Sequence, residues 1–269
     1  MTRPHTPRRH ACHARGRAIA LCGALALIAA TLLVAPPARA QLAGTEPTVL
    51  ITGSNRGIGL EFARQFAALD WRVIATVRIP EEAGELKAIK NRHPALVIER
   101  LDVTDQAQVD ALAAKYRGQP IDVLLNNAGL LAGMERQSLE TLDFALFEQE
   151  LAVNSLGPMR VSRAFLPNVL ASQQKMIVAL SSAASTHGQI RMPSSLYAYR
   201  ASKAALNMLM HILATDLANR GVRVALLNPG LVDTRGVMAL KPGDPVPEEF
   251  RNLMPAIRSG KLVLITPAE

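Results

Sequence analysis

Tyr199 and Lys203 are the two side chains of this sequence whose types and spacing best suit proton transfer. They are four residues apart, so a helix would place both side chains on one face. A tyrosine hydroxyl has an ordinary pKa of about 10, and it needs a nearby cation before it can give and take protons at neutral pH. Lys203 is such a cation. Because an isolated pair of this kind is more often an exposed helix surface, its interpretation depends on the surrounding elements.

A glycine-rich turn is the second feature with chemical meaning. It follows an apolar run and precedes a stretch with helical spacing, and it reads Thr52-Gly53-Ser54-Asn55-Arg56-Gly57-Ile58-Gly59. Glycines permit a tight turn and let backbone N–H groups approach a pyrophosphate, which the N-terminus of the next helix attracts through its dipole. The position between a strand and a helix favours nucleotide binding over a mere turn.

The elements that must position these residues alternate along the chain. Short apolar runs predict strands at Thr48–Thr52, Arg72–Val77, Leu96–Leu101, Ile121–Asn126, Met176–Ser181 and Val222–Asn228. Amphipathic stretches predict helices at Gly57–Leu69, Glu81–Asn91, Asp105–Tyr116, Leu139–Leu170 with a break near Gly157-Pro158, and Leu196–Ala218. Such βα repeats indicate one α/β domain around a parallel sheet. The last forty residues predict a loop with one short helix, Glu248–Ile257, and either a closing strand or a loop at Lys261–Ile265.

The spacing G-x-x-x-G-x-G, taken with three further segments, resembles the short-chain dehydrogenase/reductase family. The segments are Asn126-Asn127-Ala128-Gly129, Tyr199-Arg200-Ala201-Ser202-Lys203 and Pro229-Gly230, and the match runs from about Thr48 to Thr234. The resemblance implies a single-domain Rossmann fold, a doubly wound parallel sheet of six or seven strands flanked by helices. It also implies hydride transfer between a nicotinamide cofactor and a small carbonyl or alcohol substrate.

The resemblance assigns catalytic roles to four residues. Tyr199 is the general acid/base, Lys203 supplies its positive field, Ser182 holds the substrate oxygen, and Asn154 holds a water that joins Lys203 to solvent. The long segment between Ser182 and Tyr199 leaves other serines as alternatives to Ser182: Ser181, Ser185, Ser194 and Ser195. This enlarged loop and the neighbouring Tyr197 look like the carbonyl-reductase branch named after C-factor and sniffer. Tyr197 competes only weakly as the catalytic phenol, because Lys203 is six residues away on a different helix face.

Arg78 indicates which nicotinamide cofactor is bound. An acid about 20 residues beyond the glycines would bind the ribose hydroxyls of NAD, whereas Arg78 at the end of the second strand, with Arg56 in the turn, suits a 2′-phosphate. NADP(H) is therefore favoured over NAD(H), and the alternative is that Arg78 is an ordinary surface residue. The predicted cofactor-binding residues are Gly53, Ser54, Asn55, Arg56, Gly57, Ile58, Gly59, Arg78, Asp102, Val103, Asn127, Ala128, Gly129, Tyr199, Lys203, Pro229, Gly230, Val232 and Thr234.

Residues 1–40 have the composition of a targeting segment. They contain six arginines and no acid, an uncharged run from Ala18 to Ala35, and a small-residue cleavage pattern before Gln41. Cleavage would export residues 41–269, the predicted catalytic domain, to a bacterial periplasm. An uncut segment would instead anchor the protein to the membrane, and a segment without targeting function would leave it in the cytoplasm.

Charge and cysteine content exclude some functions. Without residues 1–40, 24 basic residues face 22 acidic ones, a net charge of +2, which gives no footprint for nucleic acid. Both cysteines, Cys12 and Cys22, lie in the targeting segment, so a mature chain would have no thiol chemistry. The histidines have no metal-ligand spacing, and no metal is predicted.

Two expectations about the whole protein stay open at this point. The chain ends before the last helix and strand that the family branch usually has, so sheet closure and a homodimer contact are less well determined than the catalytic site. The alternative function is a catalytically silent NADP-binding regulatory or signalling protein with the same fold. The complete set of Asn154, Ser182, Tyr199 and Lys203 weighs against that alternative.

Overall fold

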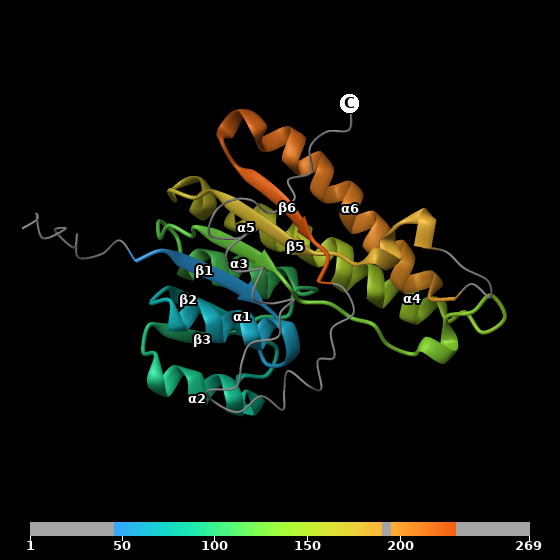
Figure 1. Ribbon diagram of the computed structural model, residues 1–269, viewed down its shortest axis with the longest axis horizontal. Helices are drawn as coiled ribbons and strands as arrows, with labels where there is room; N and C mark the ends of the chain where they lie inside the picture. Colours follow the sequence, from blue (N-terminus) through green and yellow to red (C-terminus); the bar gives the residue numbers. More distant parts are fainter. Residues whose placement is uncertain (1–45, 190–194, 230–269) are drawn as a thin grey trace, which may run out of the picture. The chain divides into compact units, whose positions relative to one another are not determined.

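The computed structural model describes residues 46–189 and 195–229 (Figure 1). Six strands form one parallel sheet in the order β3-β2-β1-β4-β5-β6. They are β1 Thr48–Thr52, β2 Arg72–Val77, β3 Leu96–Arg100, β4 Val123–Asn126, β5 Met176–Leu180 and β6 Arg223–Leu227. The sequence prediction of a parallel α/β fold is confirmed, and each strand begins and ends within two residues of its predicted bounds.

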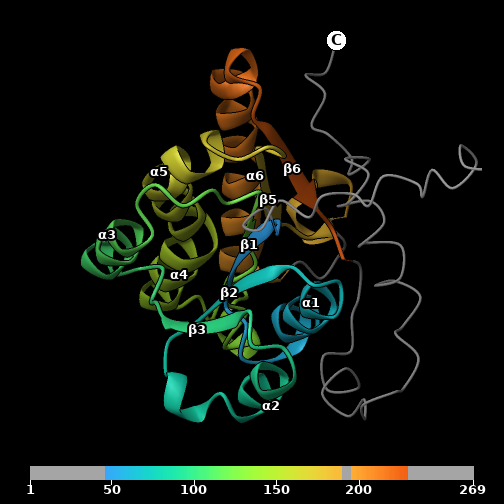
Figure 2. The same cartoon turned by 90° about the vertical axis from the view of Figure 1, so that its left-hand side faces the viewer.

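Helices cover both faces of the sheet (Figure 2). On one face lie α1 (Gly57–Ala68) and α2 (Gly84–Arg92), and on the other lie α3 (Gln106–Lys115), α5 (Gly157–Leu170) and α6 (Tyr197–Leu217). Successive strand residues point to opposite faces, so Val49 and Ile51 join the first core and Leu50 joins the second. This two-sided burial explains why β1 is apolar throughout its middle. Short 3₁₀ turns lie at Pro80–Glu82, Met134–Arg136, Ala183–Ser185, His187–Gln189 and Ala218–Arg220.

The helix predicted to begin at Leu139 begins later, as α4 (Phe144–Leu151), and this part of the prediction was wrong. The reason is a local cap. Asp143 has extended backbone, and its carboxylate accepts the N–H of Leu146 at 3.1 Å, which starts the helix at the next residue. The predicted break near Gly157-Pro158 does not occur. A π-helical segment, Ala152–Leu156, joins α4 to α5 instead, and the backbone stays helical through it.

Several predicted segments lie outside the described residues. These are the targeting segment 1–40, the C-terminal helix 248–257 and the segment 261–265. Within the two described stretches, none of the helices combines the length and the apolar character needed to cross a bilayer.

Asp122 fastens three neighbouring strands together at their amino ends. Its carboxylate accepts the N–H of Thr48 in β1 at 2.9 Å and the N–H of Gln174, just before β5, at 3.3 Å. Its own N–H donates to the carbonyl of Thr48, and its carbonyl accepts the N–H of Met176. The side chain is buried, so these backbone donors have little access to water as a substitute partner.

We expect Asp122→Ala to lower the free energy of unfolding by about 1–3 kcal/mol, because it leaves a buried N–H without an acceptor. Urea unfolding compares this variant with Asp122→Asn, which keeps one carbonyl oxygen and is expected to lose less. Asp110→Ala, at an exposed position of α3, is the control and should stay within about 0.5 kcal/mol of the parent. Equal stability of Asp122→Ala and the parent would show that the strands do not need this clamp.

Candidate active site

The glycine turn between β1 and α1 has the shape of a phosphate cradle. Gly53 and Gly57 have left-handed backbones, with φ of +69° and +55°. A methyl group on Gly59 would overlap the carbonyl oxygen of Gly53 and the side-chain amide of Asn127. Helix α1 starts with no side-chain cap and no acid in its first turn, which suits an anion at its N-terminus. The turn therefore fits the pyrophosphate of a dinucleotide.

A hydrogen-bonded clamp holds the segment after β4 beside this turn. The hydroxyl of Thr52 accepts the N–H groups of Asn127 and Ala128 at 3.0 and 2.9 Å. The side-chain amide of Asn127 donates to the carbonyls of Thr52 and Gly53 at 2.8 and 2.9 Å. The structure thus brings together two predicted cofactor-binding segments, and it uses the Asn127 side chain to join them.

The remaining turn residues divide into buried and exposed positions. Ser54 is fully buried, and its hydroxyl donates to the carbonyl of Ile51 at 3.0 Å, so its side chain shapes the turn from within. Ile58 packs against the core of the α1 face, while Asn55 and Arg56 are exposed.

Arg56 and Arg78 lie near the same edge of the sheet. The N–H of Ser54 donates to the carbonyl of Thr76 at 2.9 Å, which joins the turn to the end of β2. Arg56 and Arg78 each follow that contact by two residues, and both are exposed. Both side chains therefore lie beyond the turn that fits the pyrophosphate, where they could contact a further part of a bound nucleotide.

Asp102 and Val103 follow β3 at this edge. The Asp102 carboxylate accepts the N–H and the hydroxyl of Thr104 at 2.8 and 2.7 Å, which fixes a tight turn. Val103 is buried, and a Cβ on Gly157 would lie 2.8 Å from its Cγ2. Glycine at 157 thus permits the close approach of α5 to this loop.

Tyr199 and Lys203 lie in the first two turns of α6 and face each other as their spacing predicted. The Lys203 Nζ is 5.9 Å from the centroid of the Tyr199 ring. Lys203 is only 5% exposed, and its ammonium group donates to the carbonyl of Leu180, the last residue of β5, at 2.8 Å. This bond holds the start of α6 against the carboxyl edge of the sheet.

Burial changes the pKa values of both groups. Desolvation lowers the pKa of Lys203 to about 8, against an upward pull from the carboxylate of Glu150. Desolvation raises the pKa of Tyr199, the hydrogen bond with Ser182 lowers it, and Glu150 raises it. Both groups thus have pKa values changed by burial, a feature that is common at functional sites, and the net shift of the Tyr199 pKa is upward.

Among the serines that the structure describes, Ser182 is the one whose side chain bonds to the Tyr199 hydroxyl. Its hydroxyl also accepts the N–H of Ala184 at 3.1 Å. The hydroxyl of Ser181 donates to Asn207 at 2.5 Å, and that of Ser185 donates to the carbonyl of Ser182 at 2.6 Å. These two alternatives are thus committed to other bonds; Ser195 is exposed, and Ser194 lies outside the described residues.

Asn154 is fully buried in the π-helical segment. Its Oδ1 accepts the N–H of Leu130 at 2.7 Å, and its Nδ2 donates to the Leu130 carbonyl at 2.8 Å and to the Ser202 hydroxyl at 2.9 Å. A Cβ on Gly129 would lie 3.4 Å from this Oδ1 and 3.7 Å from the Lys203 Nζ. Asn154 and Lys203, two predicted catalytic residues, therefore lie beside the predicted cofactor-binding Gly129, which follows β4.

Residues 47–244 match the family described as short chain dehydrogenase. The chain belongs to this family. It is 36% identical over 214 residues to galactitol 2-dehydrogenase (L-tagatose-forming) of Cereibacter sphaeroides, covering 78% of this chain and 81% of that enzyme.

Solved structures of carbonyl reductases are also similar. The NADPH-bound carbonyl reductase from chicken fatty liver has a TM-score of 0.69 and 31% identity, covering 79% of this chain and 91% of that one. The carbonyl reductase Sniffer of D. melanogaster has a TM-score of 0.68 and 27% identity with the same coverages. An NADH-dependent reductase complexed with NAD has a TM-score of 0.60 and 26% identity, covering 70% of this chain and 80% of that one. The chain is thus an oxidoreductase of the short-chain dehydrogenase/reductase type.

Two buried residues of this dehydrogenase site were missed from the sequence, Glu150 and Gln137. Glu150 lies four residues before Asn154, so helical spacing could have placed both on one face. No sequence motif marks Gln137, because its hydrogen-bond partners Glu150 and Tyr199 come near it only when the chain has folded.

Some predicted cofactor residues cannot be placed beside the others. Pro229 follows β6 and is half-buried, whereas Gly230, Val232 and Thr234 lie outside the described residues. Among the described residues, no group of three or more His, Cys, Asp or Glu side chains could hold a metal ion.

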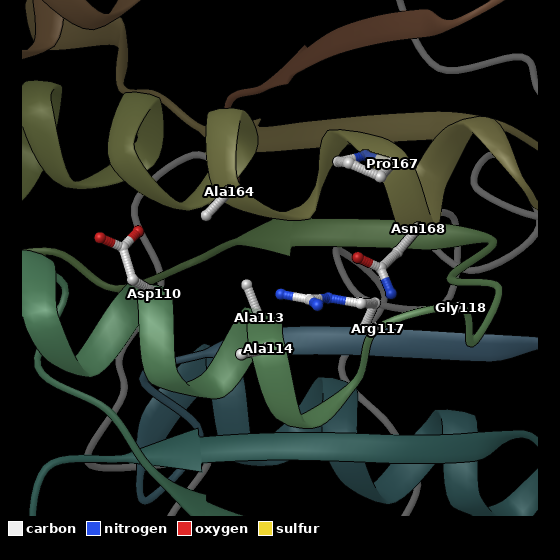
Figure 3. Close-up of a pocket in the computed structure, with 8 residues that line it drawn as sticks. All are labelled: Asp110, Ala113, Ala114, Arg117, Gly118, Ala164, Pro167 and Asn168. Atoms are coloured by element: carbon white, nitrogen blue, oxygen red, sulfur yellow. The ribbon is translucent and has the colours of Figure 1, made fainter.

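A groove between α3 and α5 is separate from this site (Figure 3). Asp110 and Arg117 line it from α3 and its end, and Asn168 lines it from α5. The Asn168 amide donates to the carbonyls of Tyr116 and Gln119 at 2.6 and 2.8 Å, so it holds the turn after α3. None of the predicted catalytic or cofactor residues lines the groove.

We expect the buried charge of Lys203 to make stability depend on pH. Its pKa falls from an ordinary 10.5 to about 8 in the folded chain. Between these pH values the unfolded chain binds more protons than the folded chain, so the free energy of unfolding rises with pH there and is flat for this group below pH 8. Across this range, the free energy of unfolding of the parent should rise by on the order of 3 kcal/mol relative to that of Lys203→Met, as measured by denaturant titrations without cofactor. A stability difference that stays constant with pH would show that Lys203 keeps its ordinary pKa.

Proposed function

We propose that this dehydrogenase is an NADP(H)-dependent reductase of small carbonyl compounds, working reversibly on the corresponding alcohols. The observation that carries the proposal is the meeting of Tyr199, Lys203 and Ser182 at the carboxyl edge of the sheet, next to a glycine turn that fits a pyrophosphate. Ligands of open parallel sheets bind at this edge. The carbonyl reductases of similar structure support the same class of reaction.

The residues of the chain divide the work of the proposed reaction. The glycine turn and the N-terminus of α1 hold the cofactor, whose nicotinamide, when bound, supplies or takes up the hydride at the carbonyl carbon. Ser182 holds the substrate oxygen beside the Tyr199 hydroxyl, which gives that oxygen its proton in reduction and takes it back in oxidation. The Lys203 ammonium favours the tyrosinate that remains. Asn154 fastens the segment after β4 to α6 and so fixes the distance between cofactor and phenol.

Arg56 and Arg78 support NADP(H) as the cofactor. A guanidinium group binds phosphate through charge-assisted, often bidentate hydrogen bonds, and both side chains are exposed at the edge where the 2′-phosphate would lie. The chicken carbonyl reductase binds NADPH, whereas another similar reductase binds NAD. The preference therefore depends on these two arginines.

The first test follows NADPH oxidation by the purified chain with a panel of small ketones and aldehydes. We expect turnover in the parent and a loss of at least about a hundredfold in kcat for Tyr199→Phe, since general acid–base groups contribute this much or more. Binding of NADPH, measured by fluorescence, should persist in the variant.

Two other tyrosines provide the comparison, because the chain contains three in all. The hydroxyl of Tyr116 lies away from the site and donates to Glu99 at 2.6 Å. The variant Tyr116→Phe should therefore keep its turnover. Loss in Tyr197→Phe but not in Tyr199→Phe would move the catalytic role to Tyr197. NADPH binding without turnover of any substrate would contradict the reductase and favour a silent regulatory protein.

The second test addresses cofactor choice. We expect Arg78→Asp to reduce kcat/KM for NADPH by roughly tenfold to a hundredfold relative to NADH, the equivalent of one charge-assisted hydrogen bond. Arg92→Asp, an exposed position at the end of α2, is the matched charge change. If both variants shift the ratio equally, the effect comes from overall charge, and the specific role of Arg78 is refuted.

A further inference from the structure

Helix α6 begins without a local cap. Leu196 precedes its first residue in a left-handed conformation, with φ of +62°, and offers no side-chain acceptor. The first backbone N–H groups of any helix lack partners within it, and a helix without an N-cap acceptor is less stable at that end. Tyr199 is the third residue of α6, so its position depends on how this end is held.

Gln137 provides the missing acceptors from sixty residues away in the sequence. Its main-chain carbonyl accepts the N–H of Tyr197 at 3.3 Å, and its side-chain Oε1 accepts the N–H of Tyr199 at 3.0 Å. The Gln137 side chain is fully buried. From a distant part of the same chain, it therefore accepts N–H groups as a serine or an aspartate does at an ordinary helix start.

Glu150 of α4 fixes the orientation of this amide. Its Oε1 accepts the Gln137 Nε2 at 3.0 Å and the N–H of Ala132 at 3.0 Å. The Gln137 Nε2 also donates to the Ala132 carbonyl at 2.8 Å. Because both neighbours are acceptors, the amide nitrogen must face them, and the amide oxygen must face Tyr199.

We propose that Gln137, held by Glu150, caps α6 from a distant part of the same chain and thereby sets the position of the Tyr199 hydroxyl. The importance of that position rests on the proposed reductase function. Gln137 and Glu150 are positioning residues, since their bonds reach Tyr199 through its backbone. The same contacts tie the segment from Leu130 to Gln137 to the catalytic helix, because Asn154 holds Leu130 and Gln137 holds Tyr199. The segment from Leu130 to Gln137 and the start of α6 are thus held in fixed positions relative to each other.

The cap needs an acceptor atom at position 150, and it does not need a negative charge. The Glu150 side chain is fully buried, and burial raises the pKa of its carboxyl group. Its Oε2 has no hydrogen-bond partner among the described residues, so only Oε1 takes part. A glutamine at 150 offers the same acceptor.

The test compares Gln137→Met, Gln137→Asn, Glu150→Met and Glu150→Gln in the full chain. We expect Gln137→Met, Gln137→Asn and Glu150→Met to speed amide hydrogen exchange in the first turn of α6. They should also lower kcat on the order of a hundredfold, the usual effect of a misplaced reacting group, with KM for NADPH within about threefold of the parent. Glu150→Gln should keep both properties. Gln137→Asn retains the amide but is one methylene too short to reach Tyr199, and it serves if the methionine variant does not fold.

Gln119→Met, in the turn after α3, is the matched control and should leave exchange in α6 and turnover unchanged. If Gln137→Met and Gln137→Asn both retain the turnover of the parent, the positioning of Tyr199 by Gln137 is overturned and the reductase stands. Loss of activity in Glu150→Gln would overturn the positioning role, because the carboxyl group itself would then be required. If the parent turns over no carbonyl compound, the reductase fails, and the exchange comparison alone decides whether Gln137 caps the helix.

Discussion

The buried ammonium group of Lys203 is the interaction on which the site depends. Removing a lysine charge from water is costly, and the hydrogen bond to the Leu180 carbonyl offsets only part of that cost. The lysine is held there because α6 packs on the sheet through Leu206, Met210 and Leu217. Apolar burial along the rest of the helix thus stabilises an unfavourable charge at its start, beside the Tyr199 ring.

The carboxyl edge of the sheet assembles around that charge through short polar bonds between loops. Thr52 and Asn127 join the glycine turn to the segment after β4, and Asn154 joins that segment to α6. The π-helical segment matters here, since π-helical turns are frequent at functional sites and this one carries Asn154. Each bond is modest alone, but together they hold the cofactor turn and the phenol to one rigid frame.

Much of this protein could be predicted from its sequence because the decisive signals are local. Alternation of apolar runs and amphipathic stretches placed the strands, since parallel strands buried on both faces must be apolar. The glycines of the turn and the four-residue spacing of Tyr199 and Lys203 express backbone geometry that any neighbouring sequence would have to respect. Family membership and the nicotinamide-dependent type of chemistry followed from the order of these motifs, whereas the roles of individual residues remain predictions.

Only the tertiary structure decided how side chains distant in the sequence share their hydrogen bonds. Ser181 and Ser182 are adjacent, yet Ser181 bonds to Asn207 and Ser182 to Tyr199, two different positions on α6. No sequence motif marks Gln137 or Glu150. Both are buried next to the start of α6, which has no cap residue of its own. The sequence by itself determined the backbone pattern and placed Tyr199 and Lys203 on one helix face. The folded chain determined which polar groups hold that pair in place, because burial leaves each polar group only the partners that packing brings within reach.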